Sequence, residues 1–291
     1  MTVRRTLPQR SRSLIGAWCF VDHYGPDEVE RTGGMLVPPH PHSGLQTVSW
    51  LFSGEIEHRD SSGAHAVVRP GVVNLMTAGS GICHSEVSTP QTRVLHGVQL
   101  WIALPDSARD VGRSFERHET EAVDLGGAQL RVLLGTVGGV TSPVRTFSPV
   151  LGAELVLSPG ARLTLYVDEA HEHGLLVDQG QVALAGVPVA PGRIGYVGTG
   201  VSQLVVEDVG GAGARMLLLG GEPLDEQIVM WWNFVGRTHD EIAAMRLAWQ
   251  SGSARYGSVE GYVGDPVRLP APELPHVTLR PRVNPPTANP G

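Results

Sequence analysis

Two short segments of this chain concentrate side chains that can bind a metal ion. The first is PHPH at residues 39–42, and the second is CHSE at residues 83–86. In each, two ligand-type side chains stand two residues apart, and residues i and i+2 of a β-strand point to the same face. If neighbouring strands carry the two pairs, all four side chains can reach one ion. The predicted ligands are His40, His42, His84 and Glu86.

Three imidazoles and one carboxylate form a nitrogen and oxygen donor set. Such a set suits non-haem Fe(II) with positions left open, and chemically it also suits Mn, Ni, Co or Cu. The set contains no cysteine, which argues against a structural zinc site. A single HxH would be better explained as polar residues at a strand end, but two such pairs in a β-rich chain favour a metal site.

Strands must position these segments, and the sequence predicts an all-β chain. Glycine and proline are abundant, at 37 and 22 of 291 residues, which favours many short strands and tight turns over long helices. Residues 45–58 alternate apolar and polar side chains around Gly54, as half-buried antiparallel strands joined by a turn do. Turn signals recur along the first hundred residues, which is typical of a sandwich or barrel.

The second half of the chain repeats this character. The run LLVDQGQVALAG resembles SWLFSGEIEH, with Gly180 where Gly54 stands in the first half. We therefore expect an internal duplication of one β fold, with a first domain at residues 1–140 and a second at residues 141–265.

One helix is predicted, near residues 238–251. Thr238 can serve as its N-cap, and Glu241 completes a capping box. The apolar residues of one face are Ile242, Met245 and Trp249. Residues 266–291 carry eight prolines, so we expect an extended, Pro-rich tail there.

Charge and composition exclude several classes of function. The net charge of −7 argues against direct binding of nucleic acid or of an anionic membrane. No apolar run is long enough for a membrane-spanning helix, and the first residues lack the apolar stretch of a secretory signal. Two cysteines cannot form a disulfide framework, which favours a reducing, cytoplasmic setting.

The residues around the two metal segments resemble the pirin family, whose members are bicupins. The resemblance rests on FVDHYGP, HPHSGLQTVSWLFSGEIEHRDSSG, MTAGSGICHSE and GVQLWIALP. It is close over residues 14–105 and continues more weakly to the C-terminal helix. It implies two β-barrel (jelly-roll-like) domains in tandem, with one metal ion, usually iron, in the first. In pirins the metal ligands match His40, His42, His84 and Glu86.

One position departs from the pattern of related cupins. Gln46 stands where the general cupin motif has a glutamate ligand. A neutral amide is a poor ligand, so Glu86 remains the one carboxylate, and we expect Gln46 beside the ligands or in the pocket wall. Met76, Trp50 and Phe52 are candidates for the same pocket, although a β-sheet core is their more common setting.

We expect structural roles for the other histidines and for Cys83. His171 and His173 form a second HxH without a third histidine, which is interpreted as a surface turn. Cys83 should point away from His84 into the core. His58 and His65 are expected at the surface.

The resemblance implies two functions of different classes. One is a quercetin 2,3-dioxygenase-like enzyme, a quercetinase, which opens a flavonol with O₂ and releases CO. In it, Glu86 would take the proton of the flavonol 3-hydroxyl as general base. The alternative is a non-catalytic regulator that binds a protein partner in transcription or metabolism according to the redox state of its iron. A sugar-isomerase-like or storage cupin is less favoured, since the cupin fold alone does not fix function.

Overall fold

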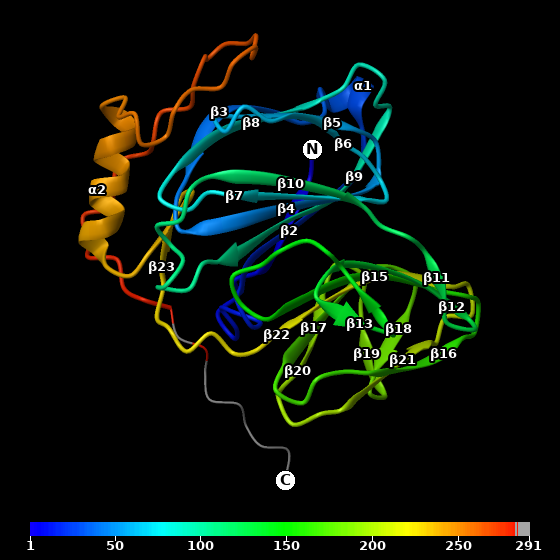
Figure 1. The fold of residues 1–291 in the computed structure, drawn as a ribbon. Coiled ribbons are helices and arrows are strands. Elements are labelled where there is room, and N and C mark those ends of the chain that lie inside the picture. The colour runs from blue at the N-terminus through cyan, green and yellow to red at the C-terminus, as the bar shows by residue number, and fades with distance from the viewer. Residues whose placement is uncertain (283, 285–291) are drawn as a thin grey trace. The chain divides into compact units, whose positions relative to one another are not determined.

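The computed structural model describes residues 1–282 and 284 (Figure 1). These residues form two compact units. The first unit comprises residues 1–3, 21–117 and 225–282, and the second comprises residues 4–20, 118–224 and 284. No helix within the described residues is long and apolar enough to cross a membrane.

Two antiparallel sheets surround the metal segments. A six-stranded sheet has the order β1-β2-β9-β4-β7-β10, and a four-stranded sheet has the order β3-β8-β5-β6. The strands of the larger sheet are β1 (Val3–Leu7), β2 (Trp18–Glu28), β9 (Val94–Ala103), β4 (Leu45–Ser53), β7 (Val72–Thr77) and β10 (Ser114–Glu119). The strands of the smaller sheet are β3 (Leu36–His42), β8 (Ile82–Ser88), β5 (Ile56–Asp60) and β6 (His65–Val68), and a short helix, α1 (Val29–Thr32), precedes β3.

The second unit is built in the same way. Its six-stranded sheet consists of β11 (Val123–Asp124), β12 (Ala128–Leu134), β15 (Val150–Leu157), β22 (Ala214–Gly221), β17 (Glu172–Gln179) and β20 (Ile194–Val197), in that order. Its four-stranded sheet consists of β16 (Arg162–Tyr166), β21 (Gln203–Asp208), β18 (Val182–Leu184) and β19 (Val187–Val189). A separate hairpin joins β13 (Thr136–Val137) and β14 (Val140–Thr141).

The strand orders confirm the predicted duplication. The order β2-β9-β4-β7 recurs as β15-β22-β17-β20, and β3-β8-β5-β6 recurs as β16-β21-β18-β19. Gly54 follows β4 with φ 85°, and Gly180 follows β17 with φ 89°. Each glycine supplies the left-handed conformation that the turn requires and that residues with a Cβ rarely adopt. The two matched glycines therefore mark the same turn in both halves.

Helix α2 (His239–Gln250) forms where the sequence predicts it. The Thr238 side chain accepts a hydrogen bond from the Glu241 backbone N–H at 3.2 Å. The buried residues of α2 are Ile242, Met245 and Trp249, as predicted. They pack with Cys83 and with Phe234 of the hairpin formed by β23 (Val229–Trp231) and β24 (Phe234–Gly236).

The compact units differ from the predicted division into residues 1–140 and 141–265. Residues 4–20 and 118–140 fold with the second unit, and residues 225–282, including α2, fold with the first. The cause of the latter is the long-range packing of α2 near Cys83, which no local pattern reveals. Residues 266–282 contain no helix or strand, as expected of a Pro-rich segment, and the rest of the predicted tail, apart from residue 284, lies outside the described residues.

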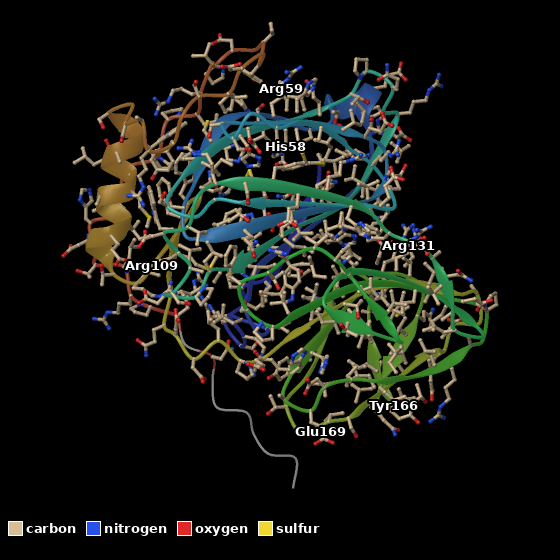
Figure 2. The ribbon with its side chains drawn as sticks, viewed as in Figure 1. His58, Arg59, Arg109, Arg131, Tyr166 and Glu169 are labelled. Carbon is tan, nitrogen blue, oxygen red and sulfur yellow. The ribbon has the colours of Figure 1, made fainter. Side chains whose placement is uncertain are left out.

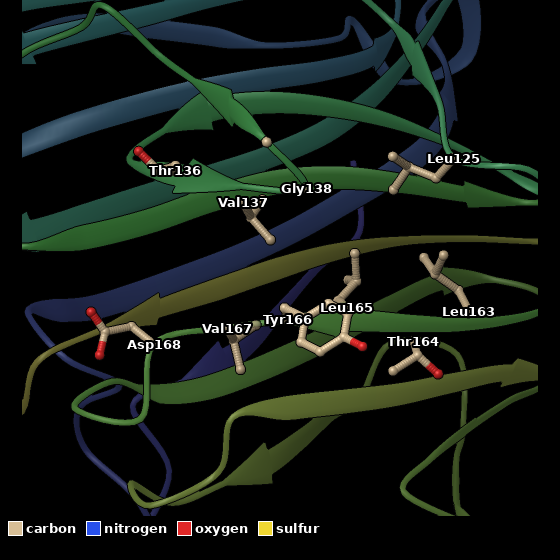
Figure 3. A pocket seen from close by; sticks show the side chains of 11 residues that line it. Leu125, Thr136, Val137, Gly138, Leu163, Thr164, Leu165, Tyr166, Val167 and Asp168 are labelled. Atoms are coloured by element: carbon tan, nitrogen blue, oxygen red, sulfur yellow. The ribbon is translucent and has the colours of Figure 1, made fainter.

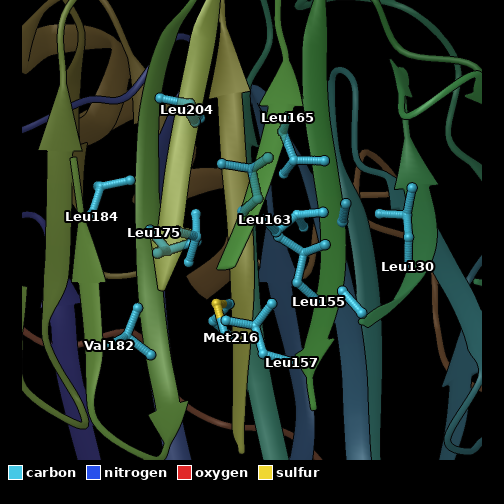
Figure 4. Packing of buried hydrophobic residues seen from close by; sticks show 14 of the residues in the cluster. Leu130, Leu155, Leu157, Leu163, Leu165, Leu175, Val182, Leu184, Leu204 and Met216 are labelled. Carbon is cyan, nitrogen blue, oxygen red and sulfur yellow. The ribbon is translucent and has the colours of Figure 1, made fainter. Parts of the chain in front are cut away.

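A continuous apolar core fills the second unit (Figure 4). Leu155, Leu163, Leu165, Leu175 and Met216 belong to it, and each is at most 8% exposed. These residues lie on several strands of both sheets of the unit. Apolar side chains therefore fill the interior of the second unit, whereas the interior of the first unit contains the histidines and Glu86.

Candidate metal centre

Strand β8 carries half of the predicted ligands and lies between β3 and β5. His84 on β8 is directly opposite His40 on β3, and Glu86 on β8 is directly opposite His58 on β5. The register of β3 and β8 shifts by a bulge between Val37 and His40. Because opposed residues share a face and a bulge redirects the side chains after it, these strands bring the ligand-type residues to one face.

The predicted ligands are buried in the first unit and fall into two groups that share His84. The ligand atoms of His40, His42 and His84 lie within 4.8 Å of one another. The ligand atoms of His58, His84 and Glu86 also lie within 4.8 Å of one another. His84 thus belongs to both groups, and all five residues are buried.

The hydrogen bonds of the three histidines leave one nitrogen of each ring for a metal ion. Nδ1 of His40 is 3.0 Å from the Pro38 carbonyl oxygen, and Nδ1 of His42 is 3.1 Å from the Asn233 carbonyl oxygen. An Nδ1–H that donates to a carbonyl fixes the tautomer in which Nε2 can ligate. Nε2 of His84 is buried and has no hydrogen-bond partner within the described chain. A buried polar atom without a partner is costly, so this donor set fits a metal ion.

Burial sets the charges of these groups. It lowers the pKa of His40 to about 4 and lowers the pKa values of His42 and His84 well below their ordinary value, with neighbouring histidines adding to the effect. Burial also raises the pKa of Glu86, while His58 and the hydrogen bond from Ser49 act in the opposite direction. The imidazoles are therefore neutral near pH 7, and metal binding requires neutral imidazoles.

His58 is buried beside the candidate ligands, so the predicted surface position is wrong. It is 3% exposed, its Nε2 lies 2.9 Å from Asp60 Oδ2, and its Nδ1 lies 3.5 Å from Nδ1 of His84. Its ring stacks on Phe115 at 4.6 Å. Its inward direction follows the alternation along β5, in which Ile56, His58 and Asp60 are buried. Figure 2 labels His58 together with its neighbour Arg59.

His65, by contrast, is exposed as predicted. Its Nε2 lies 2.8 Å from Glu57 Oε1 on the neighbouring strand. His65 is therefore an exposed histidine of the first unit that can serve as a control for the buried histidines.

Strand β4 presents Ser49 to the candidate ligands. The Ser49 hydroxyl lies 3.2 Å from Glu86 Oε1 and 2.9 Å from Gln99 Oε1. Thr47 is on the same face of β4 as Ser49, and Met76 is directly opposite Thr47 on β7. The strand register therefore brings Met76 to the Ser49 face.

The other predicted pocket residues lie elsewhere. Gln46 and Trp50 are at even positions of β4, so they point to the face opposite Ser49. The Gln46 side-chain NH₂ donates to the Thr77 hydroxyl at 3.0 Å. Phe52 packs its ring against the rings of His23 and His96, at centroid distances of 6.4 and 5.0 Å.

Cys83 points away from the histidines, as predicted. It lies in the apolar cluster beneath α2, and burial raises the pKa of its thiol to about 12. At such a pKa the thiolate is scarce at neutral pH, so Cys83 acts as a packing residue.

A cavity of about 490 Å³ lies in the second unit (Figure 3). Segments 136–139 and 163–168 contribute most of its lining, together with Leu125. Asp168 is the one metal-ligand type of side chain among these lining residues. This cavity is therefore separate from the histidine cluster of the first unit.

Comparisons with known proteins agree on one family. Residues 1–102 match the family described as Pirin, and residues 152–255 match the Pirin C-terminal cupin domain. The chain is 45% identical over 276 residues to "Putative quercetin 2,3-dioxygenase PA1205" of Pseudomonas aeruginosa, covering 94% of this chain and 86% of that protein. It is 31% identical over 249 residues to human Pirin, covering 83% of each chain. A crystal structure of quercetin 2,3-dioxygenase from Acinetobacter baumannii superposes with a TM-score of 0.90 at 38% identity, covering 96% of this chain and 92% of that one.

Proposed function

Because the chain belongs to the pirin family of bicupins, we propose that it is a mononuclear non-haem iron dioxygenase that opens flavonols of the quercetin type with O₂. The observation that carries the proposal is the buried group of His40, His42 and His84 in one unit, together with the group of His58, His84 and Glu86 that shares His84 with it. The relatives named above as quercetin 2,3-dioxygenases support the substrate class and the use of O₂.

We propose that His40, His42, His84 and Glu86 hold the metal through the three Nε2 atoms and one carboxylate oxygen. This donor set suits Fe(II) and leaves room for other divalent metals. A bound iron ion would supply the redox and Lewis-acid chemistry that opening a flavonol with O₂ requires. The carbonyl groups of Pro38 and Asn233 orient His40 and His42 for this role.

Glu86 is the proposed general base for the flavonol 3-hydroxyl. Burial raises its pKa, which increases the affinity of the carboxylate for a proton. The Ser49 hydroxyl, 3.2 Å from Glu86 Oε1, holds the carboxylate in place. Deprotonation makes the flavonol electron-rich, and addition of O₂ then opens its central ring with loss of one carbon as CO.

The pair formed by His58 and Asp60 supports this site from the side of β5. Asp60 accepts a hydrogen bond from His58 Nε2–H at 2.9 Å, which leaves Nδ1 of His58 facing His84. Asp60 is itself held by the Ser62 hydroxyl and the Ser62 backbone N–H. We propose that His58 positions His84 and Glu86 and does not itself hold the metal.

Oxygen uptake with detection of CO tests the proposal. Protein reconstituted with Fe(II), with its iron content verified, is given quercetin beside His42→Ala and His65→Ala variants. We expect uptake and CO from the native protein and from His65→Ala, and loss of both in His42→Ala. Absence of uptake by iron-loaded native protein would contradict flavonol cleavage, and the regulator that binds a protein partner would become the leading function.

A further inference from the structure

The cavity of about 490 Å³ in the second unit lies along an unpaired strand edge (Figure 3). Strand β16 is the outermost strand of its four-stranded sheet, and within the described residues only β21 pairs with it. Residues 163–168 line the cavity from β16, and residues 136–139 line it from the β13–β14 hairpin. None of the lining residues belongs to β21, so the cavity opens onto the free side of β16.

The hydrogen bonds between β16 and β21 determine which backbone groups face the cavity. Directly after β16, the Val167 N–H donates to the Ser202 carbonyl at 3.0 Å. Successive residues of an antiparallel strand direct their N–H and C=O to alternate sides, so the odd-numbered residues of β16 bond to β21. The N–H and C=O of Thr164 and Tyr166 therefore point towards the cavity, where another extended chain can pair with them.

The side chains of β16 alternate between the interior and the surface. Leu163 and Leu165 are buried in the core of the unit, whereas Thr164 is exposed and Tyr166 is 73% exposed. Residues that stand opposite each other on neighbouring strands share a face. A chain added to this edge would therefore place apolar side chains beside the leucines and polar side chains at the surface.

The corresponding edge of the first unit is covered by extended chain. Strand β3 has the place in its sheet that β16 has in the second unit. The Leu269 N–H donates to the Pro39 carbonyl of β3 at 2.8 Å, and Ser43, directly after β3, forms a parallel bridge with Phe234. Three of the seven residues of β3 are prolines, which lack an N–H, whereas β16 contains none. The edge of β16 thus retains every donor that an added segment can use.

The charge at the end of this edge is acidic. Asp168 is the one charged residue in the cavity lining, Glu169 follows it, and both are exposed. The Ala170 N–H donates to Asp168 Oδ1 at 2.9 Å, which holds the carboxylate in place. A cationic side chain is therefore favoured at this end of β16.

We propose that the free edge of β16 binds an extended segment of a partner protein, which adds to the sheet as a further strand and places a basic side chain beside Asp168. Backbone hydrogen bonds at Thr164 and Tyr166 supply affinity, and the alternating side chains supply specificity. The five residues of β16 span about 17 Å, which sets the length of the segment. None of these residues belongs to the candidate metal centre, so this binding site goes beyond the proposed dioxygenase function.

Fluorescence anisotropy of a labelled peptide, acetyl-Lys-Val-Thr-Val-Thr-Val-Lys-amide, with the metal-loaded full-length chain tests the proposal. When its threonines stand opposite Thr164 and Tyr166, one of its lysines stands opposite Asp168 in either strand direction. We expect saturable binding that weakens as salt is added. The same peptide with N-methylated threonine amides keeps the charges and side chains but cannot donate to the edge. It should bind at least about tenfold more weakly.

Variants of the chain test the same edge from the other side. Thr164→Pro removes an N–H that faces the cavity and should weaken peptide binding by at least about tenfold. The matched control Thr164→Ala keeps that N–H and should bind as the native chain does, and circular dichroism checks that both variants retain the β fold. Asp168→Asn should weaken binding less and reduce its dependence on salt. Unchanged binding by Asp168→Asn would contradict the basic side chain of the partner.

Four outcomes would overturn the proposal. These are absence of peptide binding at millimolar chain concentration, equal binding of the methylated and unmethylated peptides, equal binding by Thr164→Pro and Thr164→Ala, and self-association of the native chain that Thr164→Pro abolishes. The second outcome would show an apolar groove without strand addition, and it uses the native chain, so it does not depend on the folding of a variant. The fourth would make a second copy of this chain the occupant of the edge.

Discussion

The two halves of this chain share one strand order, but polar side chains lie inside the first half and apolar side chains fill the second. In the first half, β3 and β8 bring His40 opposite His84. The equivalent strands of the second half, β16 and β21, bring Leu163 opposite Val206, with Leu165 opposite Leu204 on the next inward pair. The same scaffold thus holds a candidate metal centre in one half and a hydrocarbon core in the other. Fold and site are separable properties of a cupin barrel.

The difference has an energetic side. Burying leucine and valine side chains in the second half stabilises it directly through the hydrophobic effect. Burying imidazoles and a carboxylate in the first half costs free energy unless each group gains a hydrogen bond or a metal ion. The bonds of His40 and His42 to backbone carbonyls offset part of that cost, whereas Nε2 of His84 has no partner within the described residues.

The second HxH, His171 and His173, differs in position from the first, His40 and His42. His173 is 1% exposed and lies within the buried stretch of β17, so the predicted surface turn is wrong for this residue. In strand order, β17 corresponds to β4, not to β3, which carries His40 and His42. The two HxH patterns therefore look alike in sequence but occupy different places in the barrel.

Removing the shared donor of the first half should have the largest effect. His84→Ala deletes the imidazole that belongs to both groups of converging ligand atoms. We expect the rate of O₂ uptake with quercetin to fall by at least about 100-fold, because loss of even an outer partner of a metal ligand costs about 10- to 100-fold. Initial rates are compared with those of His65→Ala, and a native rate from His84→Ala would contradict the assigned centre.

Removing a core side chain of the second half should affect stability and spare the metal. Leu165 is 2% exposed, so Leu165→Ala should lower the free energy of unfolding by about 2–5 kcal/mol. Urea unfolding measures this, and Val156→Ala, at a 40% exposed position on β15, is the matched control. A loss of bound metal in folded Leu165→Ala would show that the halves are not separable in the way described.

Acid should destabilise the metal-free protein through the first half. The folded-state pKa of His40 is about 4, below its ordinary 6.5, so the unfolded chain takes up this proton first as the pH falls. The stabilisation is therefore present above pH 6.5 and is lost as the pH falls through 6.5 towards 4. A shift of that size corresponds to about 3 kcal/mol.

Urea unfolding across this pH range measures the effect, and the His40→Gln variant should show a shallower pH dependence. The pKa values of His42 and His84 are lowered in the same direction, so some dependence should remain in that variant. Identical pH profiles of native and variant proteins would rule out His40 as a source.

The smallest expected effect tests where α2 belongs. Thr238→Ala removes the side chain that caps the helix and should cost about 1 kcal/mol, whereas Thr238→Ser should cost little. Because α2 packs near Cys83 in the first unit, amide exchange should quicken around Cys83 and Phe234. Faster exchange confined to the core around Leu165 would place the helix with the second unit.

Local patterns were sufficient to predict several features. Strand periodicity put His40 and His42 on one face and Cys83 on the other, and capping residues placed α2 to within a residue or two. Each of these depends on spacing within a few residues, which sequence displays directly.

Other features depend on contacts between distant segments. His58 joins the cluster because β5 pairs with β8, and α2 folds with the first unit because it packs near Cys83. Gln46 sits at a motif position whose direction only the register of β4 reveals. A single sequence states neither the strand register nor the long-range packing, so these features could not be predicted from it.

The most direct test of the central claim is the amount of metal bound per chain. The native protein, His42→Ala and His173→Ala are loaded with Fe(II) under anaerobic conditions, freed of excess metal and measured by elemental analysis. One ion per chain in the native protein and in His173→Ala, with loss of the ion in His42→Ala, is the result that the account predicts. Two ions per native chain, or one ion retained by His42→Ala, would contradict the assignment of a single centre to the first half.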